Sequence, residues 1–386
     1  MSSVGKCSLL ILQATPFCNL KCRYCYLPDR DNKARMSAET IRNTFRKFLH
    51  PHICADKVTI CWHAGEPLVA GIAFYDHAAG LCADTAPATV TVTHSVQTNA
   101  VLIDDDWCSF FKRHNFRIGI SIDGPKRFHD AQRKTRSGGG THDAVMNGIR
   151  ALQADGIEFS AITVLTLDSL SAPDEFFWFY VDNGIRKVGF NIEELEGCNQ
   201  RSSLFGSGAI GKFKEFMTKM YSLCLQNPGM LSIREFAPDT LVNQNGKFAR
   251  PANNQNVPLE IISVAANGDF STFSPELLGY RNPEYGDFIV GNVDRDDVLA
   301  ALSRPMFERL ETAIRAGVEK CRSQCEYFPF CGGGAPANKY FEKGSFVVAE
   351  TDYCRFTKKT IVDVLLETAE KSPSSSAGHA MQGAFD

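Results

Sequence analysis

The first half of the chain alternates between short β-rich runs and longer helical patterns, and this alternation constrains the fold more than any other feature. Six strands are predicted at 8–14, 58–62, 90–97, 117–122, 158–165 and 187–191. Helical patterns lie between them at 37–50, 72–83, 104–115, 142–155 and 173–183. Repeated strand–helix units of this length predict a parallel sheet with right-handed crossovers. Six such units favour an open, partial barrel over a closed barrel of eight strands.

The rest of the chain divides by composition. We expect residues 1–196 to form the barrel. Residues 197–257, enriched in Asn, Gln, Ser and Gly around a helical pattern near 210–226, are interpreted as a connector that could help bind substrate. A strand-like run at 258–265 begins a second unit, expected over 258–368. Residues 369–386 are rich in Ser, Ala and Gly, which predicts a disordered tail.

Charge and hydropathy exclude two classes of partner. The 386 residues contain 41 Lys and Arg against 44 Asp and Glu, so no broad basic field is available to hold nucleic acid. The longest apolar stretches are far shorter than the roughly 20 residues that span a bilayer, and the first residues do not resemble a secretory signal. We therefore expect a cytoplasmic protein without nucleic-acid or membrane partners.

Fourteen cysteines need an explanation, and without an export signal metal or redox chemistry is favoured over disulfides. Cys18, Cys22 and Cys25 share one loop directly after the first predicted strand. Three thiolates on a short loop can hold three irons of a cubane cluster and leave the fourth iron open. A zinc site or a buried cysteine patch is the alternative. It is less favoured, because zinc prefers a closed set of paired ligands and no histidine lies nearby in this loop.

A second cysteine group comprises Cys321, Cys325, Cys331 and Cys354, with three glycines after Cys331. Four thiolates give a fully ligated cluster, suited to electron transfer or structure. A zinc ribbon with four cysteines is the alternative. The other cysteines are scattered, and we interpret them as small core residues. They are Cys7, Cys54, Cys61, Cys82, Cys108, Cys198 and Cys224.

The first cysteine loop, Cys-x3-Cys-x-aromatic-Cys, resembles the signature of the radical S-adenosylmethionine (SAM) superfamily. In that family the open iron is chelated by the amino and carboxylate groups of SAM. An electron from the cluster then yields a 5′-deoxyadenosyl radical that removes a substrate hydrogen. The resemblance implies a 4Fe-4S cluster, SAM and an electron donor such as flavodoxin or ferredoxin.

Polar segments at the ends of later strands match the same family in order. Residues 63–67 resemble its Gly-Gly-Glu-Pro motif, with Ala64 in place of the first glycine, and imply that Glu66 receives the SAM ammonium. Arg133 could pair with the SAM carboxylate, and Tyr24 would pack near the adenine. The residues expected to contact SAM are Tyr24, Ala64, Gly65, Glu66, Asn99, Ser121, Asp123 and Arg133.

The second cysteine group resembles the SPASM extension of peptide-modifying radical SAM enzymes, which often carries two auxiliary clusters. Phe273 or Ser274, and Ala335, stand where further cysteines would be expected, so we predict one auxiliary 4Fe-4S cluster. The expected fold is therefore α/β, a partial (β/α)6 TIM-like barrel with a C-terminal SPASM-like iron–sulfur extension.

Five segments are similar to the GrrM-type peptide maturases: 15–20, 62–67, 133–138, 189–194 and 270–279. This similarity, from about residue 8 to 365, implies an enzyme that installs a three-residue cyclophane in a ribosomally synthesised precursor peptide. A ring carbon is joined to the β-carbon of a residue two positions later.

Restoring aromaticity after this coupling requires loss of one electron, which the auxiliary cluster could accept, and of one proton. Glu276 is the predicted base, with Glu193, Glu194 and Glu196 at the same end of the barrel. Two alternatives remain: a sulfatase-maturing-type enzyme that oxidises a Cys or Ser side chain, and a non-enzymatic metal-cluster scaffold.

Overall fold

One sheet runs through the whole molecule. The computed structural model describes residues 5–206, 208–237, 240 and 253–371. Its strands follow the order β10-β9-β8-β1-β2-β3-β4-β5-β6-β7. The six predicted strands are present as β1 (Cys7–Leu12), β2 (Cys54–Trp62), β3 (Thr91–Thr98), β4 (Arg117–Ser121), β5 (Phe159–Leu165) and β6 (Lys187–Ile192). Each pairs in parallel with the next, which confirms the repeated strand–helix arrangement.

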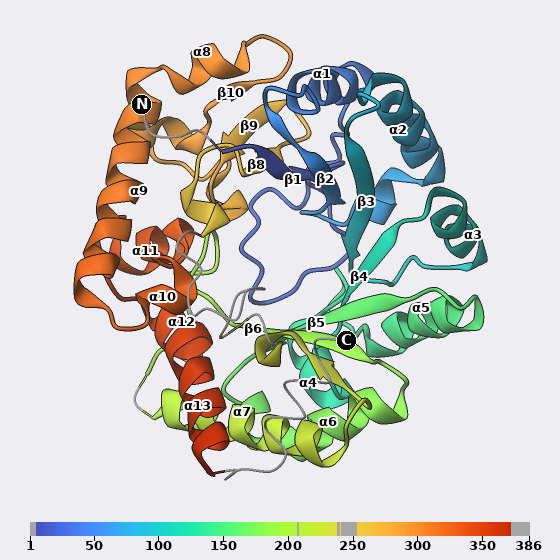
Figure 1. Ribbon diagram of the computed structural model, residues 1–386. Helices are drawn as coiled ribbons and strands as arrows, with labels where there is room; N and C mark the ends of the chain where they lie inside the picture. The colour runs from blue at the N-terminus through green and yellow to red at the C-terminus, as the bar shows by residue number, and fades with distance from the viewer. Residues whose placement is uncertain (1–4, 207, 238–239, 241–252, 372–386) are drawn as a thin grey trace.

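Helices cover the outer face of this sheet, and the long loop after β1 lies inside its curve (Figure 1). The predicted helices are α1 (Ala38–Phe48), α2 (Ile72–Thr85), α3 (Asp105–His114), α5 (His142–Ala154) and α6 (Pro173–Asp182). The sequence pattern did not reveal the short α4 (Lys126–Gln132). On α1, Ser37 caps the first turn by accepting the Thr40 N–H, and Ile41, Phe45 and Phe48 form the buried stripe.

The barrel is unclosed, as predicted. The sheet ends at β7 (Ser232–Ile233) on one side and at β10 (Gly291–Asn292) on the other, and in the described residues these edge strands do not pair with each other. The α/β partial-barrel fold class is thus confirmed. Since all strands from β8 to β7 run parallel, their carboxyl ends meet at one end of the barrel.

The C-terminal unit is joined to the barrel through the sheet itself. β8 (Ile261–Val264) pairs in parallel with β1, and β9 (Asp269–Thr272) continues the sheet in the antiparallel sense. Six α-helices follow in the described chain: α8 (Val298–Leu302), α9 (Pro305–Gln324), α10 (Phe328–Cys331), α11 (Pro336–Lys343), α12 (Asp352–Cys354) and α13 (Ile361–Lys371). The last one contacts α7 (Ala209–Gln226) of the expected connector. Residues 372–386 of the expected tail, and 207, 238–239 and 241–252 of the connector, lie outside the described residues.

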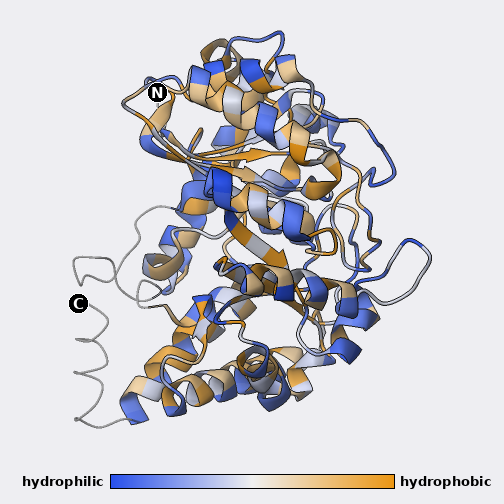
Figure 2. Ribbon diagram, turned by 90° about the vertical axis from the view of Figure 1, so that its right-hand side faces the viewer, coloured by the Kyte–Doolittle hydropathy of each residue, from blue (hydrophilic) through white to orange (hydrophobic). Residues whose placement is uncertain are grey.

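Buried apolar and aromatic side chains form the core between sheet and helices. In Figure 2 the strands are predominantly hydrophobic, whereas the helices are mixed. One aromatic group lies next to the site: Trp62 and Tyr75 meet edge-to-face at 5.1 Å, and the Tyr75 hydroxyl donates to the Pro67 carbonyl over 2.8 Å. The core thereby fixes the turn that follows β2. Among the described helices none is long and apolar enough to cross a membrane.

Candidate active site

A large cavity lies at the carboxyl ends of the parallel strands. Its volume is about 520 Å³, which falls within the roughly 300–1,000 Å³ typical of small-molecule sites. Its walls come from the loops after β1, β2, β3, β4 and β6 and from the C-terminal unit. The cavity is lined by the three loop cysteines and by seven of the eight residues expected to contact SAM: Tyr24, Ala64, Gly65, Glu66, Asn99, Ser121 and Arg133.

The cysteine loop is held by backbone hydrogen bonds to the segment after α4. The Lys21 N–H donates to the Lys134 carbonyl over 2.8 Å, and the Arg23 N–H donates to the Gln132 carbonyl over 3.0 Å. The Arg136 guanidinium adds a hydrogen bond of 2.9 Å to the Cys18 carbonyl. A loop pinned on both sides in this way presents its side chains to the cavity in a fixed arrangement.

Two of the three loop thiols, Cys18 and Cys22, are neutral in the protein alone. Burial raises the pKa of Cys18 to about 12 and that of Cys22 to about 11, although the Arg133 charge lowers the latter. A thiol gives up its proton when it ligates iron, so metal binding here would release protons. Three thiols on one cavity wall fit a cluster with one iron left open to a small molecule. Cys61 also lines the cavity, but from strand β2 rather than from the loop.

The turn after β2 brings Glu66 to the strand ends. Gly65 has a φ of +71°, and a Cβ there would lie 2.4 Å from the Thr15 carbonyl oxygen, so only glycine allows this close approach to the cysteine loop. Glu66 is buried, and its carboxylate accepts hydrogen bonds from the Thr98 hydroxyl (2.7 Å) and the Asn99 N–H (2.8 Å). Burial nevertheless raises the pKa of Glu66, and these hydrogen bonds oppose the rise.

Asp123 and Arg133 form a buried ion pair beside the cavity. Arg133 donates from Nε and Nη2 to the two oxygens of Asp123 over 3.0 and 3.1 Å, and the Tyr24 hydroxyl donates to the same carboxylate. The Val164 N–H donates to it as well. Asp123 is the one expected SAM contact that does not line the cavity. The structure therefore gives this carboxylate the task of holding Arg133 and Tyr24 in place.

The two polar residues at the ends of β3 and β4 already have protein partners. The Asn99 amide donates to the Asn19 side chain over 2.7 Å, which joins the third strand to the cysteine loop. The Ser121 hydroxyl accepts from the Gln97 amide over 3.0 Å. A Cβ at Gly119 would collide with Gln97, so this glycine makes room for the contact.

Three glutamates from distant parts of the chain meet in the same cavity. Glu194 and Glu196 follow β6, and Glu276 follows β9. Burial raises the pKa of Glu276 to about 7 and that of Glu194 to about 8. It also raises the pKa of Glu196, where the charges of the other two add to the effect. The cavity thus holds carboxyl groups poised for proton exchange near neutral pH.

The three carboxyl groups differ in their partners. Glu194 accepts a hydrogen bond of 2.6 Å from the Asn338 amide of α11. Within the described residues no side chain donates a hydrogen bond to the carboxylate of Glu276 or to that of Glu196. The nearby Glu193 accepts from the Ser203 N–H and hydroxyl, so it caps its own loop. Glu276, the base expected from the sequence, is therefore free to meet a substrate proton.

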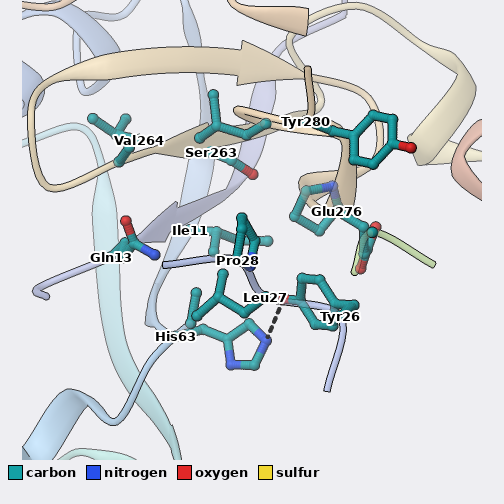
Figure 3. A pocket seen from close by; sticks show the side chains of 15 residues that line it. Ile11, Gln13, Tyr26, Leu27, Pro28, His63, Ser263, Val264, Glu276 and Tyr280 are labelled. Atoms are coloured by element: carbon teal, nitrogen blue, oxygen red, sulfur yellow. Dashed lines mark hydrogen bonds between the residues drawn. The ribbon is translucent and has the colours of Figure 1, made fainter. Parts of the chain in front are cut away.

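A smaller cavity of about 60 Å³ adjoins the large one, and Tyr26, His63 and Glu276 line both. In Figure 3 the Tyr26 hydroxyl points towards His63, whose Nε2 lies 3.5 Å away. Burial lowers the pKa of His63 to about 4, so the imidazole is neutral. The pKa of Tyr26 is raised by burial and by the charges of Glu276 and Cys25, which places Tyr26 near both the glutamates and the cysteine loop.

The four C-terminal cysteines also come together. Cys321, Cys325, Cys331 and Cys354 line one pocket with about 20 Å³ of free space. This donor set fits a fully ligated cluster. No group of three or more His, Cys, Asp or Glu side chains among the described residues is placed to hold a single metal ion. The ligands of a cubane cluster are more widely separated than those of a single ion, so cysteines that hold a cluster need not form such a group.

α11 lies between the two cysteine sites, and the sequence did not single out its residues. Ala335, just before this helix, lines both the large cavity and the four-cysteine pocket. Asn338 reaches Glu194 in the cavity, and Lys339 reaches Cys321 in the pocket. The three glycines at 332–334 predicted only a flexible turn ahead of this helix. Tyr26, one residue past the last loop cysteine, was also missed.

Sequence comparisons agree with this geometry. Residues 12–176 match the family model of the radical SAM superfamily. The chain is 40% identical over 377 residues to an uncharacterized protein of Synechocystis sp., covering 96% of this chain and 94% of the relative. It is 34% identical over 343 residues to a serine-type anaerobic sulfatase-maturating enzyme of Bacteroides thetaiotaomicron, covering 84% of this chain and 81% of the relative.

Solved structures share the fold at lower identity. anSMEcpe with bound AdoMet and the Kp18Cys peptide aligns with a TM-score of 0.76 and 20% identity, covering 95% of this chain and 100% of that one. Streptococcus suis SuiB bound to its precursor peptide SuiA aligns with a TM-score of 0.66 and 17% identity, covering 90% and 76%. These likenesses establish a common architecture for the two proteins and this chain.

Proposed function

Because this chain belongs to the radical SAM superfamily, we propose that it is a peptide maturase that installs a three-residue cyclophane. The bond joins an aromatic ring carbon to the β-carbon of a residue two positions later in a ribosomally synthesised precursor. One observation carries the proposal: a single cavity is lined by the three loop cysteines and by Glu194, Glu196 and Glu276, and it adjoins a four-cysteine pocket across α11. That SuiB and anSMEcpe were solved with bound peptides supports a peptide substrate here.

The first part of the site prepares SAM. With SAM bound, a 4Fe-4S cluster on Cys18, Cys22 and Cys25 would supply the 5′-deoxyadenosyl radical that takes the β-hydrogen. Glu66, fixed by Thr98 and Asn99, retains lone pairs that can accept from the SAM ammonium. Of the five N–H donors of Arg133, two engage Asp123 in the described part of the chain, and the others can bind the SAM carboxylate.

The second part of the site removes the proton and the electron that must leave after coupling. When the peptide carbon radical has added to the ring, one proton and one electron must leave. Glu276 would accept the proton, since its carboxylate is free of side-chain partners and its pKa is raised to about 7. The four-cysteine pocket lies beyond Asn338 and Ala335, and a cluster there would accept the electron.

A second candidate is oxidation of a Ser or Cys side chain to a carbonyl, as in sulfatase maturation. The 34% identity to the serine-type enzyme over most of both chains favours it. The same cavity, base and electron acceptor would serve this reaction, because it also removes a hydrogen atom, a proton and an electron from one peptide. The two candidates therefore differ in the substrate residue rather than in the machinery.

Tandem mass spectrometry separates the candidates. The full-length protein, reconstituted under anaerobic conditions, is incubated with SAM, dithionite and a synthetic peptide of aromatic-x-polar triplets. Crosslinking predicts loss of two hydrogens and no backbone fragmentation within a modified triplet. A carbonyl confined to one Ser side chain, trapped with a hydrazide, would instead establish the second candidate. Absence of 5′-deoxyadenosine would contradict both and favour a metal-binding scaffold.

A further inference from the structure

Lys339 is a buried cation whose only hydrogen-bond partners in the described structure are neutral or sulfur groups. Its residue is 4% exposed. The ammonium donates to the Gly317 carbonyl over 2.9 Å and to the Cys321 Sγ over 3.2 Å. A Cβ at Gly317 would lie 2.0 Å from the Phe346 carbonyl oxygen and 3.3 Å from the lysine Nζ, so this glycine of α9 is required by the Phe346 backbone and lies close to the ammonium.

A buried ammonium needs a negative partner. Lysine is almost never fully buried unless it is paired, because removing its charge from water costs several kcal/mol in order of magnitude. The Gly317 carbonyl is neutral, and no carboxylate among the described residues pairs with the Lys339 ammonium. The position becomes favourable when the pocket is anionic, and four thiolates around an iron–sulfur core make it so.

Another lysine of the pocket is placed differently. Lys359 also lines it, but its ammonium forms an ion pair of 2.6 Å with Glu350. Lys339 instead directs its charge at a cysteine sulfur. A cation with an N–H···S contact stabilises the more negative, reduced form of a cluster over the oxidised form, and so raises the reduction potential.

We propose that Lys339 is the internal counter-cation of the auxiliary cluster and sets its potential high enough to take the electron left by ring coupling. This inference rests on the proposed function. In the step concerned, the coupled ring loses one electron to the oxidised cluster and one proton to Glu276. α11 connects the two acceptors, because Asn338 donates to Glu194, which lines the same cavity as Glu276, and the next residue contacts the cluster ligand.

A redox titration of the full-length protein tests the role of Lys339. Cys18, Cys22 and Cys25 are replaced by Ala, so that only the auxiliary cluster contributes iron and an EPR signal. Lys339→Met is compared with Lys339→Arg and with Lys343→Met. Lys343 makes a matched control because it lies on the same helix with an exposed side chain. Iron content and midpoint potential are measured for each.

Lys339→Met should lower the ratio of reduced to oxidised cluster at fixed potential at least tenfold, a shift of about 59 mV for one electron. Lys339→Arg should retain most of the original midpoint, and Lys343→Met all of it. If Lys339→Met loses its iron, retention of iron by Lys339→Arg supports the need for a cation, and equal loss by both contradicts it.

Two further results would overturn the inference. One is a Lys339→Met protein with full iron and an unchanged midpoint. The other is an absence of iron from the variant in which only the three loop cysteines are replaced by Ala, because the auxiliary cluster would then not exist. A clear midpoint shift in a protein that leaves the peptide unmodified would contradict the proposed function alone.

Discussion

The two cysteine sites differ in the number of sulfurs they offer and in the space beside them. The loop site presents three cysteines to a cavity of about 520 Å³, whereas the C-terminal site places four cysteines around about 20 Å³. An incomplete ligand set with a large cavity suits activation of a small molecule at an open iron. A complete set in a closed pocket suits storage of an electron. The same type of ligand can therefore serve two tasks, and the surroundings determine which.

The strongest test of the difference removes one loop cysteine. Cys22→Ala should abolish 5′-deoxyadenosine formation, because the cluster that binds SAM loses a ligand, while the iron of the C-terminal site remains. Liquid chromatography of the nucleoside and iron analysis measure the two effects. Cys61→Ala is the matched control, since this cysteine lines the same cavity from β2. Equal loss of cleavage in Cys61→Ala would contradict the assignment of the loop.

The converse variant is Cys331→Ala. Here the crosslinked peptide should disappear because the electron acceptor is lost. SAM cleavage should stay within about tenfold of the original rate, a barrier change below about 1.4 kcal/mol. Both products are followed in the same reaction. If cleavage fails as completely as it does in Cys22→Ala, the two sites do not have separate tasks.

A smaller effect is expected when the predicted general base of the large cavity is replaced. Glu276→Gln should slow peptide crosslinking by about 100-fold or more, the usual contribution of a general base. Glu193→Gln, whose parent carboxylate caps Ser203, is the control and should have little effect. A base works when ionised, so the original rate should rise with pH through about 7. A pH profile unchanged by Glu276→Gln would show that another group takes the proton.

The smallest expected effect is on the free energy of unfolding and concerns the turn after β2, which lies against the cysteine loop. Ala64 has a φ of +69°, a conformation that costs non-glycine residues roughly 1–2 kcal/mol. Ala64→Gly should raise the free energy of unfolding by about 0.5–1 kcal/mol, after the entropic cost of glycine is deducted. Ala151→Gly in α5 should lower it by about 1 kcal/mol. Chemical denaturation measures both, and a destabilised Ala64→Gly would show that the alanine methyl packs favourably.

The strands and helices of the barrel and the two cysteine groups could be predicted from local sequence patterns. Hydrophobic periodicity predicted β1 to β6 and five of the barrel helices, because these patterns repeat over a few residues. Cysteine spacing predicted two groups, and the structure brings each group to one pocket. The carboxyl-end placement of Glu66, Asn99 and Ser121 followed from the parallel topology.

Contacts between residues far apart in the sequence could not be predicted from such local patterns. Asp123 and Arg133 were both expected at SAM, but the ion pair between them depends on how α4 returns the chain to β4. The pairing of β8 with β1 joins residues about 250 positions apart, and no local pattern encodes it. No sequence pattern marked Lys339, because its burial and its contacts with Gly317 and Cys321 arise only when α9 packs against α11.

The most direct measurement of the central contrast is an EPR spectrum of the reduced protein with and without SAM, recorded on Cys22→Ala and on Cys331→Ala. SAM should alter the cluster signal of Cys331→Ala, which retains the loop site, and leave that of Cys22→Ala unchanged. A signal insensitive to SAM in Cys331→Ala, or zinc in place of iron at the loop cysteines, would contradict the account.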